Sequence, residues 1–77
     1  MEKDLVVYMA KSLVDDPDGV DVSIVEGEKS TILELKVSEE DIGKVIGKHG
    51  RIAKAMRTIL SASATKAGKR IVLEILD

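Results

Sequence analysis

The sequence predicts an α+β fold in which three helices cover one face of a three-stranded mixed sheet. Two observations support this prediction. The hydrophobic patterns follow one another in the order helix, strand, strand, helix, helix, strand, and all six fit within 77 residues. We therefore expect a single domain over residues 1–77, because a sheet covered on one face by helices is the simplest way for so short a chain to bury one core.

The first helix is predicted within residues 2–16, where apolar residues recur three or four positions apart, as on one face of an amphipathic helix. Pro17 should end this helix, because proline disfavours the helical conformation of the residue before it. The apolar positions are Leu5, Val6, Met9, Ala10, Leu13 and Val14.

Three segments alternate between apolar and polar residues, as half-buried strands do. The segments at 20–26 and 31–37 meet at the turn "EGEKS" and are expected to form an antiparallel hairpin. The third segment, at 69–77, follows two helices and is expected to pair in parallel. The residues expected on the buried face are Val20, Val22, Ile24, Leu33, Leu35, Val37, Ile71, Leu73 and Ile75.

Two further helices are predicted between the hairpin and the last strand. The shorter helix starts with Ser38 as its N-cap, continues with acids that suit the helix dipole, and ends at Gly47. The longer helix runs from Arg51 to about Lys66 and stops at Gly68. Its apolar stripe is expected to consist of Ile52, Ala55, Met56, Ile59, Leu60 and Ser63.

Charge is divided unevenly along the chain, although the net charge is only −2. Residues 1–41 hold four lysines and twelve acids, whereas residues 42–73 hold eight cations and no acid. A basic half on an acidic body indicates a localised surface for a polyanion such as nucleic acid. The same charges would equally suit helices with ordinary solvated faces, so charge alone leaves both interpretations open.

Composition excludes several classes of protein. The chain has no cysteine and one histidine, so disulfides and the common zinc sites lack ligands, and no metal or cofactor is expected. We find no group of residues that could run a reaction, so we expect neither an enzyme nor a small-molecule substrate. No apolar run reaches the ~20 residues that span a bilayer, and the N-terminus lacks signal-peptide features. We therefore expect a soluble, cytoplasmic protein without membrane association.

Three established loop motifs do not match this sequence, two of them at the glycine-rich segment "GKVIGKHGRIAKAM" and one at an acidic stretch elsewhere. A Walker-type P-loop needs four residues between its first glycine and its Gly-Lys pair, and a hydroxyl residue after that pair. Here three residues separate Gly43 from Gly47, and His49 follows Lys48. A dinucleotide-binding fingerprint would need glycine in place of Val45. A calcium loop at "DDPDGVD" would put Val14 and Val25 at its first and last ligand positions.

The remaining layout is a Gly-x-x-Gly loop between two helices. The glycines allow a phosphate backbone to approach closely, and the amides at the start of the second helix point toward that phosphate. Lys48 and Arg51 are candidates for phosphate contact, with Lys54 beside them. The loop itself consists of Gly47, Lys48, His49 and Gly50.

In this setting the chain resembles the KH family, and within it the small bacterial single-domain KH proteins of the KhpA type. The resemblance rests on "IGKVIGKHGRIAKAMRTIL" and covers the full length, and the helix-first order is similar to the type II KH topology. The residues that it implies as a clamp on about four nucleotides of single-stranded RNA are Gly47, Lys48, His49 and Gly50. Those that it implies on the short helix lining one wall of the groove are Ile42, Gly43 and Lys44.

The resemblance further implies self-association, as a homodimer, or pairing with a larger KH-containing protein of the Jag type. It also implies a role in bacterial post-transcriptional control, including RNA chaperoning. The alternative is an assembly subunit that uses the KH fold mainly to contact protein. Tyr8 is the only aromatic residue, so bases would meet aliphatic side chains and hydrogen-bonding groups in the groove rather than stack on rings.

Apolar and small residues of the second half are assigned to two places. The residues expected in the core are Val45, Ile46, Ile52 and Met56, and Ile46 is expected to hold the loop in place most directly. The residues predicted to form a dimer surface are the small residues at 61–65, Ala53, Ala55, Val72 and Leu76. The small residues would equally suit helix propensity alone.

Overall fold

The predicted order of elements is confirmed in the computed structural model, which describes residues 2–76 and, for Lys66 and Ala67, the backbone alone. Short 3-10 turns precede the first strand (Pro17–Gly19), open the second helix (Glu39–Asp41) and join the last two helices (Lys48–Gly50). The helices and strands are α1 (Glu2–Leu13), β1 (Asp21–Glu26), β2 (Ser30–Lys36), α2 (Ile42–Ile46), α3 (Arg51–Ala67) and β3 (Arg70–Ile75).

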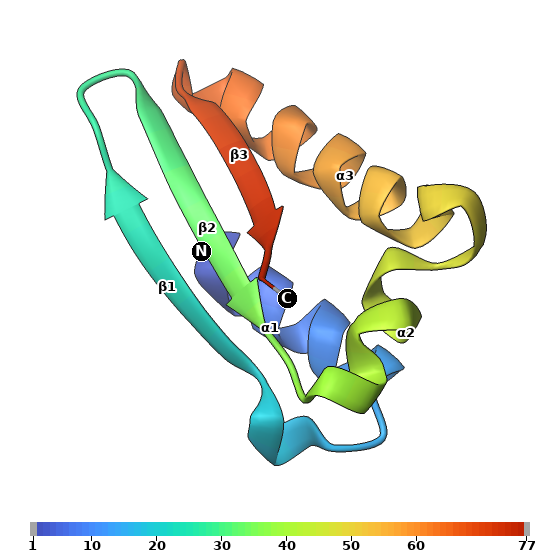
Figure 1. The fold of residues 1–77 in the computed structure, drawn as a ribbon. Helices are drawn as coiled ribbons and strands as arrows, with labels where there is room; N and C mark the ends of the chain where they lie inside the picture. Colours follow the sequence, from blue (N-terminus) through green and yellow to red (C-terminus); the bar gives the residue numbers. More distant parts are fainter. Residues whose placement is uncertain (1, 77) are drawn as a thin grey trace.

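The sheet has the order β1-β2-β3, so β2 is central and β3 is an edge strand. β1 pairs antiparallel with β2 and β3 pairs parallel with β2, which confirms the expected mixed sheet. α1 and α3 lie on the same side of this sheet, and α2 sits beyond one end of it (Figure 1). Within residues 2–76, no helix combines the length and the apolar character needed to cross a membrane.

The core lies between this sheet and the helices. Leu33 and Leu35 of the central strand are completely buried, because they have a strand on each side and helices above. Ile24 was also expected to be buried but is 45% exposed, and it lines a shallow hollow with Glu2 and Lys3 at the start of α1. The buried cluster consists of Val6, Ala10, Val22, Leu33, Leu35, Val37, Val45, Met56, Leu60 and Leu73.

The buried stripe of α3 differs from the predicted one. Its fully buried positions are Ala53, Met56, Leu60 and Ala64, which recur with the spacing of one helix face. Of the predicted stripe, Ile52 is half-buried, whereas Ala55 is exposed and Ile59 is 47% exposed. The prediction merged two adjacent stripes, because apolar residues occupy both and the sequence does not say which one faces the sheet. Ala53 and Ala64 therefore pack inside the domain and are not available as a dimer surface.

Candidate nucleic-acid interface

The Gly-x-x-Gly loop reverses the chain between α2 and α3 by using three residues with positive φ. Gly47 ends α2 with φ 78° and ψ 172°, a conformation reached essentially by glycine alone. Gly50 is left-handed, with φ 73° and ψ 15°, and forms the N-cap of α3. His49 between them is also left-handed, with φ 59°, which is uncommon for a residue with a side chain. The loop is therefore a fixed backbone shape, and the glycines are required by that shape.

The loop presents donors and cations together at the start of α3. Among the residues that the structure describes, no side chain caps this end of α3; the Arg51 N–H donates to the Lys48 carbonyl, and the N–H groups that follow have no side-chain acceptor there. Lys48 and His49 are exposed on the loop, and Arg51 and Lys54 are exposed on the first turn of the helix. The structure thus brings together the predicted loop residues, Arg51 and Lys54. An anion would find backbone donors, the positive end of a helix dipole and exposed cations in one place.

Apolar side chains on the inner side of the loop support it, and the sequence analysis predicted this packing only in part. Val45 is completely buried, whereas Ile46, expected to hold the loop in place, is only half-buried. α2 has little more than one turn, and its inward face is taken by Val45, so the next residue turns toward the surface. Ile52 packs against Gly47 so tightly that a Cβ built on this glycine would lie 2.6 Å from the Ile52 Cγ1.

A buried carboxylate anchors α2 to the segment that follows α1. Asp41 is 1% exposed, and its Oδ1 and Oδ2 accept the backbone N–H groups of Asp15 and Asp16 at 3.2 and 3.0 Å. Lys44 Nζ lies 3.1 Å from Asp41 Oδ1 and 2.6 Å from Asp15 Oδ2. Ser38, predicted to cap α2, instead donates its hydroxyl to Asp16, and no side-chain cap is formed by Ser38. These contacts fix the position of α2, and with it the start of the Gly-x-x-Gly loop.

The charges of this anchor stabilise one another. Burial by itself would raise the pKa of Asp41, but the hydrogen bonds from Lys44 and from the amides of Asp16 and Asp15 outweigh burial, and the pKa is lowered. The pKa of Lys44 is raised, first by its hydrogen bond to Asp15 and then by that to Asp41. Both groups therefore remain charged at neutral pH, and the ionised carboxylate is the form that the fold favours.

We expect Asp41→Asn to lower stability at neutral pH and to flatten the loss of stability in acid. A carboxylate whose pKa is lowered by folding stabilises above its unfolded pKa of about 4, and this stabilisation is lost as the pH falls through the lower folded value. The amide can accept only one of the two backbone N–H groups, because its other end is a donor. Urea unfolding between pH 3 and 7 checks this. An acid dependence as steep as that of the wild type would contradict it.

The three residues predicted to line the groove wall on α2, namely Ile42, Gly43 and Lys44, differ in how accessible they are to a ligand. Gly43 is exposed, and a Cβ built on it would meet nothing within 4 Å, so this face of α2 is open. Ile42 is half-buried and lines a hollow of about 630 Å³ with Val37 and Leu76. Lys44 already lies between two carboxylates, so we expect it to contribute less to binding than Lys48 does. The contact of these three residues with a ligand stays a prediction.

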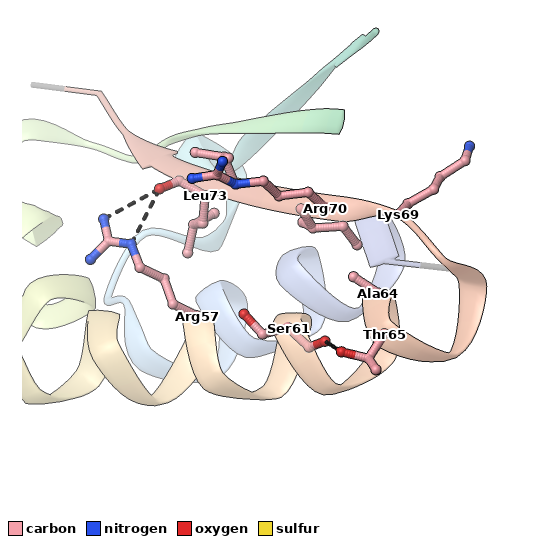
Figure 2. A pocket seen from close by; sticks show the side chains of 9 residues that line it. Arg57, Ser61, Ala64, Thr65, Lys69, Arg70 and Leu73 are labelled. Atoms are coloured by element: carbon pink, nitrogen blue, oxygen red, sulfur yellow. Dashed lines mark hydrogen bonds between the residues drawn. The ribbon is translucent and has the colours of Figure 1, made fainter. Parts of the chain in front are cut away.

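Sequence reasoning missed a second hollow, of about 420 Å³, between the C-terminal half of α3 and β3 (Figure 2). Arg57 reaches across it from α3, and its Nε and Nη2 donate to the Leu73 carbonyl oxygen of β3, each at 3.3 Å. Its signals in the sequence were the absence of acids between residues 42 and 73 and the spacing of Arg57 with Lys54, which suits a position beside the groove. Its lining residues are Arg57, Ser61, Ala64, Thr65, Lys69, Arg70, Ile71, Val72 and Leu73.

Comparison with known families places the chain among KH domains. Residues 3–75 match a family model described as "KhpA/KhpB, KH domain". The chain is 64% identical over 74 residues to a protein of Clostridium acetobutylicum named "RNA-binding protein KhpA", covering 96% of this chain and 99% of the relative. It is 57% identical over 76 residues to the protein of that name from Borreliella burgdorferi, covering 99% and 93%.

Solved structures show the same fold at lower sequence similarity. The chain superimposes on part of Era from Aquifex aeolicus with a TM-score of 0.61 and 20% identity, over 96% of this chain and 29% of Era. It also matches Era in a complex with MgGDPNP and nucleotides 1506–1542 of 16S ribosomal RNA, with a TM-score of 0.62, 20% identity, and 96% and 28% coverage. At this level of identity the likeness confirms the α+β fold and carries no argument about the site.

Proposed function

The chain belongs to the KhpA/KhpB family of KH domains, and from this premise we propose that it binds short single-stranded RNA through its Gly-x-x-Gly loop. The observation that carries the proposal is the start of α3, which has no side-chain cap and directly follows a loop of fixed shape with exposed Lys48 and His49. Backbone N–H groups in this position suit a phosphate, and KH loops hold about four nucleotides by their backbone. The bases would then turn toward the open face of α2, where Gly43 leaves room and Ile42 offers apolar contact.

The proposal includes no catalytic step and no cofactor. Relatives over nearly the full length are named as RNA-binding proteins, which supports a binding module of the kind used in post-transcriptional control. A cytoplasmic location, where bacterial transcripts are, follows from the proposed role. An assembly subunit that contacts only protein would have no use for the uncapped helix start and its cations.

Binding by one domain should be weak and sensitive to salt. If about 2–4 phosphates are engaged, a slope of ~0.7 per phosphate for single strands predicts a several-fold to tens-fold loss of affinity between about 50 and 200 mM salt. Titration of labelled randomised RNA of four to five nucleotides, followed by fluorescence anisotropy across that salt range, measures the slope. An affinity independent of salt would contradict the phosphate clamp and favour a site for protein or for an apolar ligand.

The proposal includes a dimer, because two weak clamps on one RNA raise avidity by ~10²–10⁴ when both engage. The best-suited surface is the apolar face between α1 and α3, where Tyr8 is 72% exposed beside Ile59. A single exposed apolar residue is ordinary, but these two line one hollow of about 460 Å³ with Ile52 and Ala55. The partner is a second copy, or a larger KH-containing chain of the Jag type that presents an equivalent face.

Sedimentation equilibrium of single variants distinguishes this face from the one predicted around Val72 and Leu76. Ile59→Glu should make the protein monomeric at micromolar concentration, because a carboxylate would be buried without a partner at the contact. Leu76→Glu, at a residue that is 39% exposed, is the matched control and should leave the dimer intact. The reverse result would assign the contact to the β3 side. A wild-type monomer would leave only pairing with another chain.

A further inference from the structure

The face of the sheet that points away from the helices carries its apolar and charged side chains in ordered rows. α1 and α3 cover the opposite face and α2 sits beyond one end, so the helices of residues 2–76 leave this face open (Figure 1). Side chains alternate along a strand, and Val22, Leu33 and Leu73 are buried on the helix side. Their neighbours along each strand therefore point outward, to the open face.

The register of the strands brings three β-branched residues into one row across the open face. Val25 of β1 pairs with Ile32 of β2, and Ile32 pairs with Val72 of β3. Val25 is 51% exposed, whereas Ile32 and Val72 are half-buried by their neighbours in the sheet. An apolar row thus crosses all three strands.

Opposite charges lie at equal distances on the two sides of this apolar row. Arg70, which pairs with Ser30, precedes Val72 by two residues along β3. Glu74, which pairs with Glu34, follows Val72 by two residues. At ~3.3 Å per residue, each of these pairs lies about 7 Å from the row. The open face is therefore cationic on one side of the apolar row and acidic on the other.

The two glutamates have no counter-charge on their own sheet. They are register partners on strands ~4.8 Å apart, and like charges placed directly opposite one another destabilise a sheet. Among the side chains that the structure describes, neither Glu34 nor Glu74 has an ion-pair partner. The next pair along the strands, Asp21 and Lys36, carries opposite charges that balance each other. The glutamate pair therefore suits a cation that another molecule supplies.

A second copy of this chain supplies such a cation at the matching place. Two sheets can pack face to face about a two-fold axis that runs along the apolar row, so that each strand lies antiparallel to the same strand of the other copy. Val25, Ile32 and Val72 then meet their own counterparts. Arg70 of each copy stands over Glu74 of the other, because both lie two residues from the row. An isologous contact requires this self-complementarity of one surface, which favours a second copy over an unrelated partner.

We propose that two copies associate through their open sheet faces, by the apolar row and two Arg70–Glu74 ion pairs. This contact lies on the side of the domain opposite α1 and α3, so it is distinct from the proposed dimer and joins such dimers into longer assemblies. Three strands ~4.8 Å apart and six residues long give a face of roughly 14 by 20 Å. This is smaller than the ~800 Å² that each partner buries in a standard interface, so we expect association at roughly 0.1–1 mM protein.

Exchange of charge between positions 70 and 74 tests the contact. Sedimentation equilibrium of Ile59→Glu, in which the face between α1 and α3 is blocked, measures the sheet contact alone and without RNA. In this background, Glu74→Arg and Arg70→Glu should each weaken association roughly three- to tenfold, because like charges then meet across the axis. The double variant Arg70→Glu/Glu74→Arg should restore it, because the same ion pairs form with their signs reversed. Val25→Asp should remove it, because a carboxylate would be buried in the apolar row.

Urea unfolding separates a contact role of Glu74 from a structural one. Glu74→Arg removes the repulsion from Glu34, so it should raise the free energy of unfolding although it weakens association. Glu26→Arg is the matched control, because it makes the same change of charge on β1. Glu26 is exposed and pairs with Thr31, which is buried on the helix side, so its replacement should leave association unchanged.

Equal association in the wild-type and singly exchanged sheets would overturn the inference, and so would a double variant as weak as the single ones. A protein that stays monomeric up to about 1 mM in the Ile59→Glu background would overturn it as well, and would leave the glutamate pair to a basic partner of another kind. None of these measurements contains RNA. If RNA binding fails while the charge exchange behaves as expected, the proposed function alone is refuted.

Discussion

The double substitution Lys48→Asp/His49→Asp is expected to remove RNA binding while the domain stays folded. Both side chains are exposed, so we expect their replacement to leave the packing of the core intact. Aspartate also tolerates the left-handed backbone found at His49, as histidine does. Two carboxylates would then stand where a phosphate binds, which turns attraction into repulsion. We expect affinity for a four- to five-nucleotide RNA to fall roughly 10- to 100-fold at low salt.

The control for this result is Lys3→Asp/Lys11→Asp on α1. It alters the net charge by more than the loop variant does, yet both of its sites are exposed on α1 and lie outside the loop. If net charge governed binding, the control would lose as much affinity as the loop variant. Circular dichroism and thermal unfolding verify that both proteins are folded. A folded loop variant with wild-type affinity would refute the clamp.

Gly47→Ala should be the most damaging single-methyl change in the loop. It forces a side chain onto a backbone conformation reserved for glycine, and it drives the new Cβ to 2.6 Å from Ile52 Cγ1. Strain and overpacking together predict a loss of about 2–5 kcal/mol in the free energy of unfolding. Gly50→Ala should cost only about 1–2 kcal/mol, because its backbone is left-handed but nothing lies within 4 Å of the new methyl group.

Gly68→Ala supplies the comparison outside the loop. Gly68 ends α3 with φ 70° and has open space around it, so its stability cost should equal that of Gly50→Ala. RNA affinity should fall in Gly50→Ala, where a methyl group stands before the helix amides, and stay unchanged in Gly68→Ala. Urea denaturation with RNA titration of the three variants checks both rankings. Equal costs at Gly47 and Gly50 would contradict the close packing described for Ile52.

The order of elements and the glycine loop could be predicted because both are local properties of the sequence. Alternation of apolar residues defines the strands, and the spacing of Gly47 and Gly50 defines a turn between helices whatever the rest of the chain does. The choice of buried stripe on α3 could not be predicted. Apolar residues such as Ile52 and Ile59 lie beside the core positions, and only the docking of the helix on the sheet separates them.

The contacts that hold the site together could not be predicted from the sequence either, for a different reason. Asp41 binds the amides of residues 25 and 26 positions away, and a backbone amide carries no residue-specific signal. The acids of residues 39–41 were therefore assigned to the helix dipole alone. The same holds for Arg57, whose partner is the carbonyl of Leu73 and not a side chain. Long-range contacts between a side chain and the backbone become visible only in three dimensions.

The contact of Arg57 with Leu73 also bears on how the protein avoids self-aggregation. β3 is an edge strand, and an edge with unpaired backbone groups is a template on which a foreign strand can extend the sheet. A guanidinium laid across the middle of that edge occupies the carbonyl that an added strand would need. It also places a positive charge in the path of the incoming chain. The arginine that shapes the hollow therefore also interrupts this edge of the sheet as a place where a further strand could pair.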